Sequence, residues 1–109
     1  MKRIAQTIRL RPEHRQEYLT LHSAVWPGVE AALHRSNIRN YSIYLHGDAL
    51  FAYFEYHGPE AEFDERMRQI ARAPRMREWW DIMEPMQVPR ADRKPGAWWS
   101  EMEAVFHLD

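Results

Sequence analysis

Residues 38–57 read IRNYSIYLHGDALFAYFEYH. Two runs rich in β-branched and aromatic residues, 38–46 and 50–57, lie on either side of Gly47 and Asp48. Such residues favour strands, and a glycine beside an aspartate between two such runs is a common signal for a tight turn. The segment therefore predicts an antiparallel hairpin near the middle of the chain.

Strand and helix signals alternate on both sides of this hairpin. Pro12 stands where the first turn of a helix tolerates proline, whereas Pro27, Pro59 and Pro74 follow residues at which regular structure should break. The expected elements, in order, are a strand over 2–10, a helix that is interrupted at 26–27 and resumes to about 36, the hairpin, helices carrying 63–70 and 76–86, a loop over 85–95 and a closing strand over 101–108.

This order is β-α-β-β-α-β, typical of a ferredoxin-like α+β fold, in which helices cover one face of an antiparallel sheet. A chain of 109 residues has the usual size of one domain, so we predict a single domain over 1–109. The other face of the sheet must also be covered by something. We therefore expect a second copy of the chain or a ligand on that face, and predict a homodimer.

The composition excludes several classes of function. There is no cysteine, which rules out disulfides, a thiol nucleophile and thiolate metal sites. The net charge of −1 offers no basic surface for nucleic acid or an anionic membrane. The histidines are scattered and form no HExxH or similar motif, so we expect no metal. Neither a signal-peptide pattern nor a membrane span is evident, so a cytoplasmic location is expected.

Aromatic residues are the unusual feature, with five tryptophans, five tyrosines and four phenylalanines. Tyr18, His22 and Trp26 follow one another at four-residue steps, which places Tyr18 and His22 on one face of a helix. Trp79-Trp80 and Trp98-Trp99 are doublets, and neighbouring residues cannot both face the core. These residues could form a binding site, or a buried or interfacial face.

Four segments together resemble the L-rhamnose mutarotase family. They are EYLTLHSAVWPGVEAAL, RNYSIYL, REWW and the terminal AVFHL, which cover nearly the whole chain in order. The combination of HxxxWP, NYxIYL and a tryptophan doublet is fairly specific. The resemblance implies a dimeric α+β barrel, made by two ferredoxin-like subunits packed sheet to sheet. It also implies an isomerase that interconverts the α and β anomers of a 6-deoxy-hexose, L-rhamnose or L-fucose.

The resemblance also implies roles for particular residues. His22 looks like the family's catalytic proton donor, and Tyr18 and Tyr41 look like tyrosines that contact the sugar. Trp79 and Trp80 match the doublet that lines the sugar site. Ring opening and closure require a general acid and a general base but no metal or redox cofactor, and histidine serves both roles near neutral pH. Tryptophan faces suit the apolar side of a sugar ring.

Two other functions remain open at this point. A cofactor-independent monooxygenase of the same barrel fold would also place His, Trp and Asn near an apolar cavity. A non-catalytic ligand-binding barrel would use the same aromatic residues without turnover. The fold alone separates none of these, because one fold hosts many functions.

Overall fold

The hairpin predicted at the centre of the chain forms in the structure, a computed structural model that describes residues 1–109. Strand β2 (Ile38–His46) is joined to β3 (Ala49–Tyr56) through Gly47, whose φ of 60° is in the left-handed region. A glycine adopts this conformation without the steric penalty of a side chain. The turn residue is therefore the one that the geometry requires.

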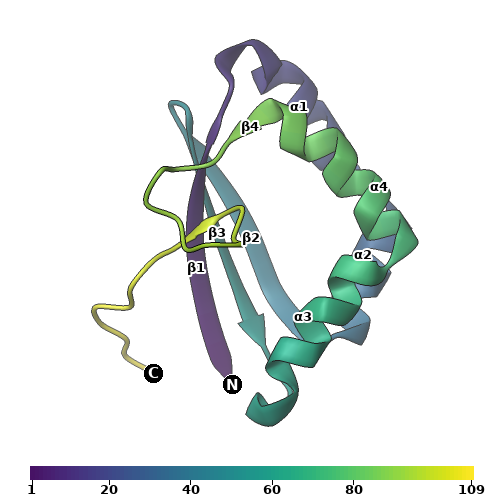
Figure 1. The fold of residues 1–109 in the computed structure, drawn as a ribbon, viewed down its shortest axis with the longest axis vertical. Helices are drawn as coiled ribbons and strands as arrows, with labels where there is room; N and C mark the ends of the chain where they lie inside the picture. Colours follow the sequence, from purple (N-terminus) through teal and green to yellow (C-terminus); the bar gives the residue numbers. More distant parts are fainter.

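Strand β1 (Lys2–Leu10) lies at the centre of the sheet (Figure 1). It pairs antiparallel with β3 over almost its whole length. Its other edge pairs with two short strands, β4 (Gln87–Val88) near Leu10 and β5 (Ser100–Glu101) near Thr7. The order β2-β3-β1-β4 is that of a ferredoxin-like sheet, so the predicted fold class is confirmed.

Four α-helices line one face of the curved sheet (Figure 1). Prolines at 12, 27, 74 and 85 stand in the first turn of a helix or 3-10 turn, where the missing backbone N–H costs nothing. The helical elements are the turn Pro12–His14, α1 (Arg15–His22), α2 (Pro27–Arg35), the turn Glu60–Glu62, α3 (Phe63–Arg72), α4 (Pro74–Met83) and the turn Glu84–Met86.

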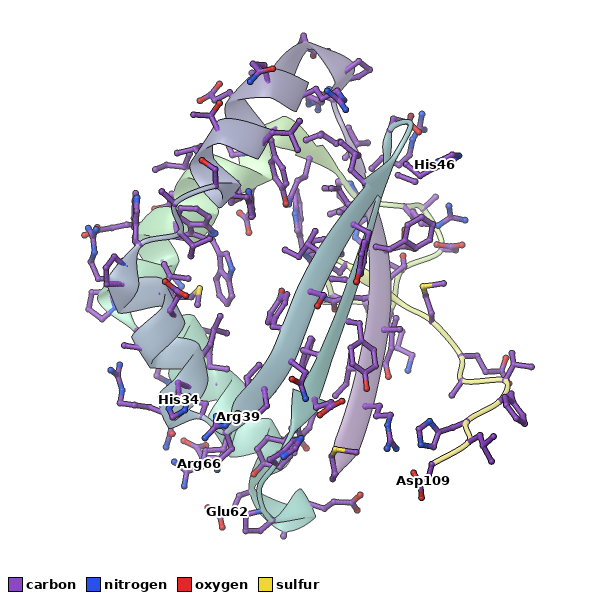
Figure 2. The ribbon with its side chains drawn as sticks, turned by 180° about the vertical axis from the view of Figure 1, so that it is seen from behind. His34, Arg39, His46, Glu62, Arg66 and Asp109 are labelled. Atoms are coloured by element: carbon purple, nitrogen blue, oxygen red, sulfur yellow. The ribbon has the colours of Figure 1, made fainter.

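The core lies between this helical layer and the sheet. Ile8 and Leu50 sit opposite each other on β1 and β3, and both are almost fully buried. From the helices, Val29, Ile70 and Met76 pack into the same cluster. Side chains from both layers project into the space between them in Figure 2. This burial leaves the opposite face of the sheet without a cover in one chain.

A β-bulge in β2 changes which side chains face the core. The pairing with β3 shifts between Arg39 and Ser42, and Asn40 has a φ of 51°. Asn40 Nδ2 donates a hydrogen bond to Glu55 Oε1 (2.7 Å), while the ring of Tyr41 stacks on buried Phe54 at 5.2 Å. One extra residue in a strand reverses the alternation of side chains. The bulge therefore turns Tyr41 toward the helical side of the sheet.

Two predictions at the C-terminal end were wrong. The segment 85–95, predicted as a loop, contributes β4, and the closing strand predicted over 101–108 is limited to Ser100–Glu101. The last backbone bond to the sheet runs from Met102 N to Ala5 O (2.7 Å). Beyond it, Phe106 is 82 % exposed. The alternating pattern marks an apolar side of this segment, but one chain supplies no surface for it.

We predict that Asn40 is required at the bulge for its conformation. Asn40→Val should lower the free energy of unfolding by about 1–3 kcal/mol, because a β-branched residue is strained at positive φ. Asn40→Gly keeps the backbone conformation and loses only the bond to Glu55, so it should cost less. Urea denaturation of both variants measures the difference, and equal losses would contradict the prediction.

Candidate active site

Helix α1 brings Tyr18 and His22 together, as their four-residue spacing predicts. Their rings stack with centroids 4.2 Å apart and an angle of 25° between planes. Tyr18 is buried, and His22 is partly buried. Both lie on the side of α1 that packs toward the core, since Tyr18 belongs to the core cluster. A titratable pair is thus held in a fixed geometry by one helix.

The hydrogen bond of His22 determines its tautomer. Nδ1 lies 2.9 Å from the carbonyl oxygen of Tyr18, and because a carbonyl can only accept, Nδ1 carries the hydrogen. In the neutral ring Nε2 then has a free lone pair. Nε2 makes no hydrogen bond within the chain. It is not fully buried either, because the one fully buried side-chain N or O atom without a partner is Arg66 Nε. Nε2 is therefore accessible to a ligand as a proton acceptor.

Burial favours the neutral form of His22. Desolvation lowers the pKa of the imidazole from its ordinary value of 6.5, and the bond to the Tyr18 carbonyl opposes this shift in part. The ring is therefore uncharged at neutral pH. A neutral histidine with a free Nε2 is prepared to accept a proton first and to return it later.

Two tryptophans form one wall of the site. The ring of Trp79, on α4, meets His22 edge-on at 5.3 Å and Trp26 edge-on at 5.1 Å. The guanidinium of Arg75 lies over the outer face of Trp26, 4.2 Å from the ring centroid. Edge-to-face packing and a cation over the ring both hold aromatic side chains in place. The contact with Trp79 helps to hold the ring of His22 in its orientation.

Tyr41 contributes a second phenol from the sheet. Its pKa is raised to about 12, chiefly by desolvation and secondly by the nearby Tyr18 hydroxyl. The residue as a whole is nevertheless 38 % exposed. Desolvation also raises the pKa of Tyr18 to about 12. Both tyrosines therefore stay protonated at neutral pH and can donate hydrogen bonds.

Comparison with known sequences identifies the family. The sequence profile described as L-rhamnose mutarotase matches residues 3–108. Proteins named L-rhamnose mutarotase from Paraburkholderia xenovorans and Lactiplantibacillus plantarum are each 33 % identical over 111 residues, which cover 100 % of this chain and 97 % and 100 % of theirs. The chain belongs to the L-rhamnose mutarotase family.

Solved structures agree on the fold. An L-rhamnose mutarotase from Formosa agariphila superimposes with a TM-score of 0.76 at 23 % identity, and each chain is covered completely. Tetracenomycin F2 cyclase from Streptomyces glaucescens, a type II polyketide cyclase, gives 0.69 at 16 % identity, over 100 % of this chain and 98 % of that one. The mutarotase family thus shares its architecture with an enzyme of different chemistry.

The structure of this mutarotase-family chain brings together most of the predicted site residues. His22 contacts both Tyr18 and Trp79, and Tyr41 lies on the helical side of the sheet, stacked on Phe54. Trp80 follows Trp79 on α4 but is 36 % exposed and makes no aromatic contact with this group. Its role in sugar binding stays a prediction. Trp79 belongs to the core as well as to the wall of the site.

The structure also adds residues that motif reasoning missed. Gln87 Nε2 donates to the Tyr18 hydroxyl (3.1 Å), and Trp98 Nε1 donates to Gln87 Oε1 (2.9 Å). Gln87 lies in the charged, proline-rich segment that reads as a loop, so no sequence signal marks it. Asn40, inside the run predicted as a strand, forms the bulge.

A groove of about 580 Å³ runs between α2 and β2 and is lined by Tyr41. Figure 2 labels His34 and Arg39, which line the groove where the helix meets the strand. Its volume is within the usual range for small-molecule sites, but Tyr18, His22 and Trp79 do not line it. No group of three or more His, Cys, Asp or Glu is arranged to hold a metal ion. None of the helices has the length and apolar character needed to cross a membrane.

We predict that His22 titrates below 6.5 and that this affects stability. The unfolded chain takes up the proton first, so the contribution of neutral His22 is fully present above about pH 6.5 and is lost as the pH falls toward the lower folded pKa. NMR titration of the imidazole measures the pKa. The free energy of unfolding, measured at about pH 7.5 and 5.5, should differ less between these two pH values in His22→Gln than in the wild type. A pKa at or above 6.5 would contradict the prediction.

Proposed function

We propose that this chain is an isomerase that interconverts the α and β anomers of a 6-deoxy-hexose, with L-rhamnose as the preferred sugar. The observation that carries the proposal is the free Nε2 of neutral His22 beside the protonated hydroxyl of Tyr18. Mutarotation needs one group that accepts a proton and one that donates it. The names of the relatives support L-rhamnose as the substrate.

The proposed reaction begins with ring opening. His22 Nε2 accepts the proton of the anomeric hydroxyl while the Tyr18 hydroxyl donates its proton to the ring oxygen. The bond between C1 and the ring oxygen breaks, and an aldehyde forms at C1. Rotation about the C1–C2 bond presents either face of the aldehyde. The ring closes when Tyr18 takes its proton back and protonated His22 returns its proton to the oxygen on C1.

The surrounding aromatic residues suit this substrate. Tyr41 offers a hydroxyl to the sugar from the sheet, and the ring of Trp79 beside His22 offers an apolar surface for C–H groups. Trp80 is proposed as a further sugar contact at the exposed side of α4. Both proton-transfer groups belong to the chain, so the proposed reaction requires no cofactor or metal.

We predict that His22→Ala reduces anomer exchange on L-rhamnose by roughly 10²-fold or more, because the proton acceptor is removed. Magnetisation-transfer NMR measures the exchange, with L-fucose in parallel to identify the preferred sugar. His46→Ala is the matched control, since His46 lies at the hairpin end of β2, remote from Arg39 and the groove (Figure 2). Wild-type exchange no faster than in buffer alone would overturn the proposed function.

We also propose that the chain acts as a homodimer. On the face of the sheet without helices, Tyr44 and Phe51 sit opposite each other and are 67 % and 38 % exposed. Val105, Phe106 and Leu108 of the C-terminal segment are almost fully exposed as well. Exposed apolar surface on this scale marks an interface. A second copy that packs sheet to sheet would cover both sets of side chains.

The charges near this face favour a second copy as the partner. A hollow of about 500 Å³ on the sheet is lined by Thr7 and Phe51 and by charged side chains of both signs, among them Lys94 and Glu101. The C-terminal segment carries Glu103 and ends with Asp109 beside its apolar residues. Each surface carries apolar groups beside charges of both signs, so a second copy can place apolar against apolar and acidic against basic groups. Neither a nucleic acid nor a membrane is proposed as a partner, and the proposed location is the cytoplasm.

We predict that Phe106→Asp converts the dimer to a monomer, because a charge replaces an exposed apolar side chain in the proposed interface. Ile82→Asp is the matched control, because Ile82 is exposed on α4 on the helical side of the sheet. Sedimentation equilibrium measures the mass of both variants and the wild type. A wild-type monomer, or a Phe106→Asp dimer as tight as the control, would contradict the proposed assembly.

A further inference from the structure

Two hydrogen bonds in series link Trp98 to the Tyr18 hydroxyl through Gln87. Trp98 Nε1 donates to Gln87 Oε1 (2.9 Å), and Gln87 Nε2 donates to Tyr18 Oη (3.1 Å). Gln87 is only 4 % exposed. A buried amide normally satisfies its oxygen and its nitrogen with partners. Both are satisfied here by residues from two different segments.

Trp98 determines which way the Gln87 amide points. An indole N–H can only donate, so the group facing it must be the amide oxygen. The amide NH₂ then faces Tyr18, and it too can only donate. Gln87 therefore cannot accept a hydrogen bond from the Tyr18 hydroxyl. The direction of both bonds follows from the chemistry of the indole.

This direction leaves the Tyr18 hydrogen available. A phenol has one hydrogen and accepts through its lone pairs. Because Tyr18 Oη accepts from Gln87, its own hydrogen points elsewhere, and no acceptor for it exists within the chain. His22 stacks on the Tyr18 ring, with centroids 4.2 Å apart. The hydrogen is thus free to be donated to a ligand beside these rings.

We propose that Gln87, oriented by Trp98, is a positioning residue that keeps the Tyr18 hydrogen free for donation to the sugar ring oxygen. The inference rests on the proposed mutarotase function. Gln87 acts on the ring-opening step in two ways. It directs the Tyr18 hydrogen toward the sugar, and its N–H stabilises the negative charge that develops on Oη as the proton leaves.

The fold places Gln87 for this role. It lies in β4, where it pairs with Leu10 of β1 and the backbone of Arg11 bonds to Met86 (2.8 Å). Residues 89–99 then lead back to the sheet at β5, which puts Trp98 next to Gln87. The amide is therefore supported by the sheet on one side and by Trp98 on the other.

The ring-opening step conserves atoms and protons. The Oη–H bond of Tyr18 and the bond between C1 and the ring oxygen break, and a hydroxyl forms at the former ring oxygen. At the same time His22 Nε2 gains the proton from the anomeric hydroxyl, and C1 becomes an aldehyde. Tyr18 is left as a phenolate that accepts a hydrogen bond from Gln87. Ring closure reverses each transfer.

Two substitutions of similar size separate this role from a merely structural one. Gln87→Met removes both hydrogen bonds. Gln87→Glu, assayed from about pH 7 to 9 because burial raises the pKa of a carboxyl group, still accepts from Trp98 when ionised but also accepts from Tyr18, so it captures the hydrogen that the sugar needs. Trp98→Phe removes the group that orients the amide. Gln16→Glu, on the exposed side of α1, is the matched control.

The proposal predicts a definite order of activities. Relative to the wild type, kcat for anomer exchange on L-rhamnose should fall roughly ten- to hundredfold in Gln87→Met, and further in Gln87→Glu. kcat should fall less in Trp98→Phe, and it should not fall in Gln16→Glu. KM should stay within about twofold in every variant, because the lost interaction develops in the transition state.

The outcomes distinguish the possible failures. If Gln87 only anchors the segment that carries Trp98, Gln87→Glu should be milder than Gln87→Met, and this order would overturn the proposal. An unchanged kcat in both variants would overturn it too. Thermal melting checks that each variant folds. If Gln87→Glu does not fold, the kcat of Trp98→Phe tests the proposal instead. Exchange absent from the wild type would instead refute the proposed function.

Discussion

The pairing of β1 on both edges is the constraint on which the site depends. One edge bonds to β3 along nearly the whole strand, and the other bonds to β4 and β5. Backbone N–H and C=O groups in the interior must be paired, so a central strand recruits whatever segments can complete it. By taking β4 as a partner, β1 brings Gln87 to Tyr18. The same pairing requirement thus builds the sheet and completes the site.

The two faces of the sheet differ in the charge state of their titratable groups. On the open face, Glu55 accepts hydrogen bonds from Asn40, His57 and Tyr53, in that order of effect, and they lower its pKa to about 2. These bonds support folding above the ordinary carboxyl pKa of 4.5, and the support is lost as the pH falls toward 2. Because Asn40 forms the bulge, a charged group on one face holds Tyr41 in place on the other.

The proposed site, by contrast, consists of groups that burial keeps neutral. Desolvation lowers the pKa of His22 and raises those of Tyr18 and Tyr41 to about 12. At neutral pH the site thus offers one proton acceptor and two donors without a net charge. A neutral sugar gains no long-range attraction from charges, so hydrogen-bond direction and ring stacking carry its recognition. This is why the orientation of one amide has consequences for catalysis.

The sequence by itself determined the order of elements, the fold class and the proximity of Tyr18 to His22. Hydrophobic periodicity and proline positions are local signals, and a four-residue spacing is a local geometry. The family resemblance added Tyr41, Trp79 and Trp80 as candidates, and their roles remain proposals. What the local signals missed was the bulge at Asn40, which reads as an ordinary strand position. They also misjudged the last segment, where an alternating pattern predicted a strand that lacks a partner in one chain.

Only the tertiary structure decided how the candidate residues act. The tautomer of His22 depends on one carbonyl, and the direction of the Tyr18 hydrogen depends on Gln87 and Trp98, which lie 69 and 80 residues away in the chain. Burial, which shifts the pKa of each group, is likewise a property of the packed layers. The tautomer of His22 arises from a local contact four residues away, but the hydrogen-bond direction and the burial arise from contacts between distant segments. Spacing within a sequence carries no information on them, whereas the pairing of β1 with its partners does.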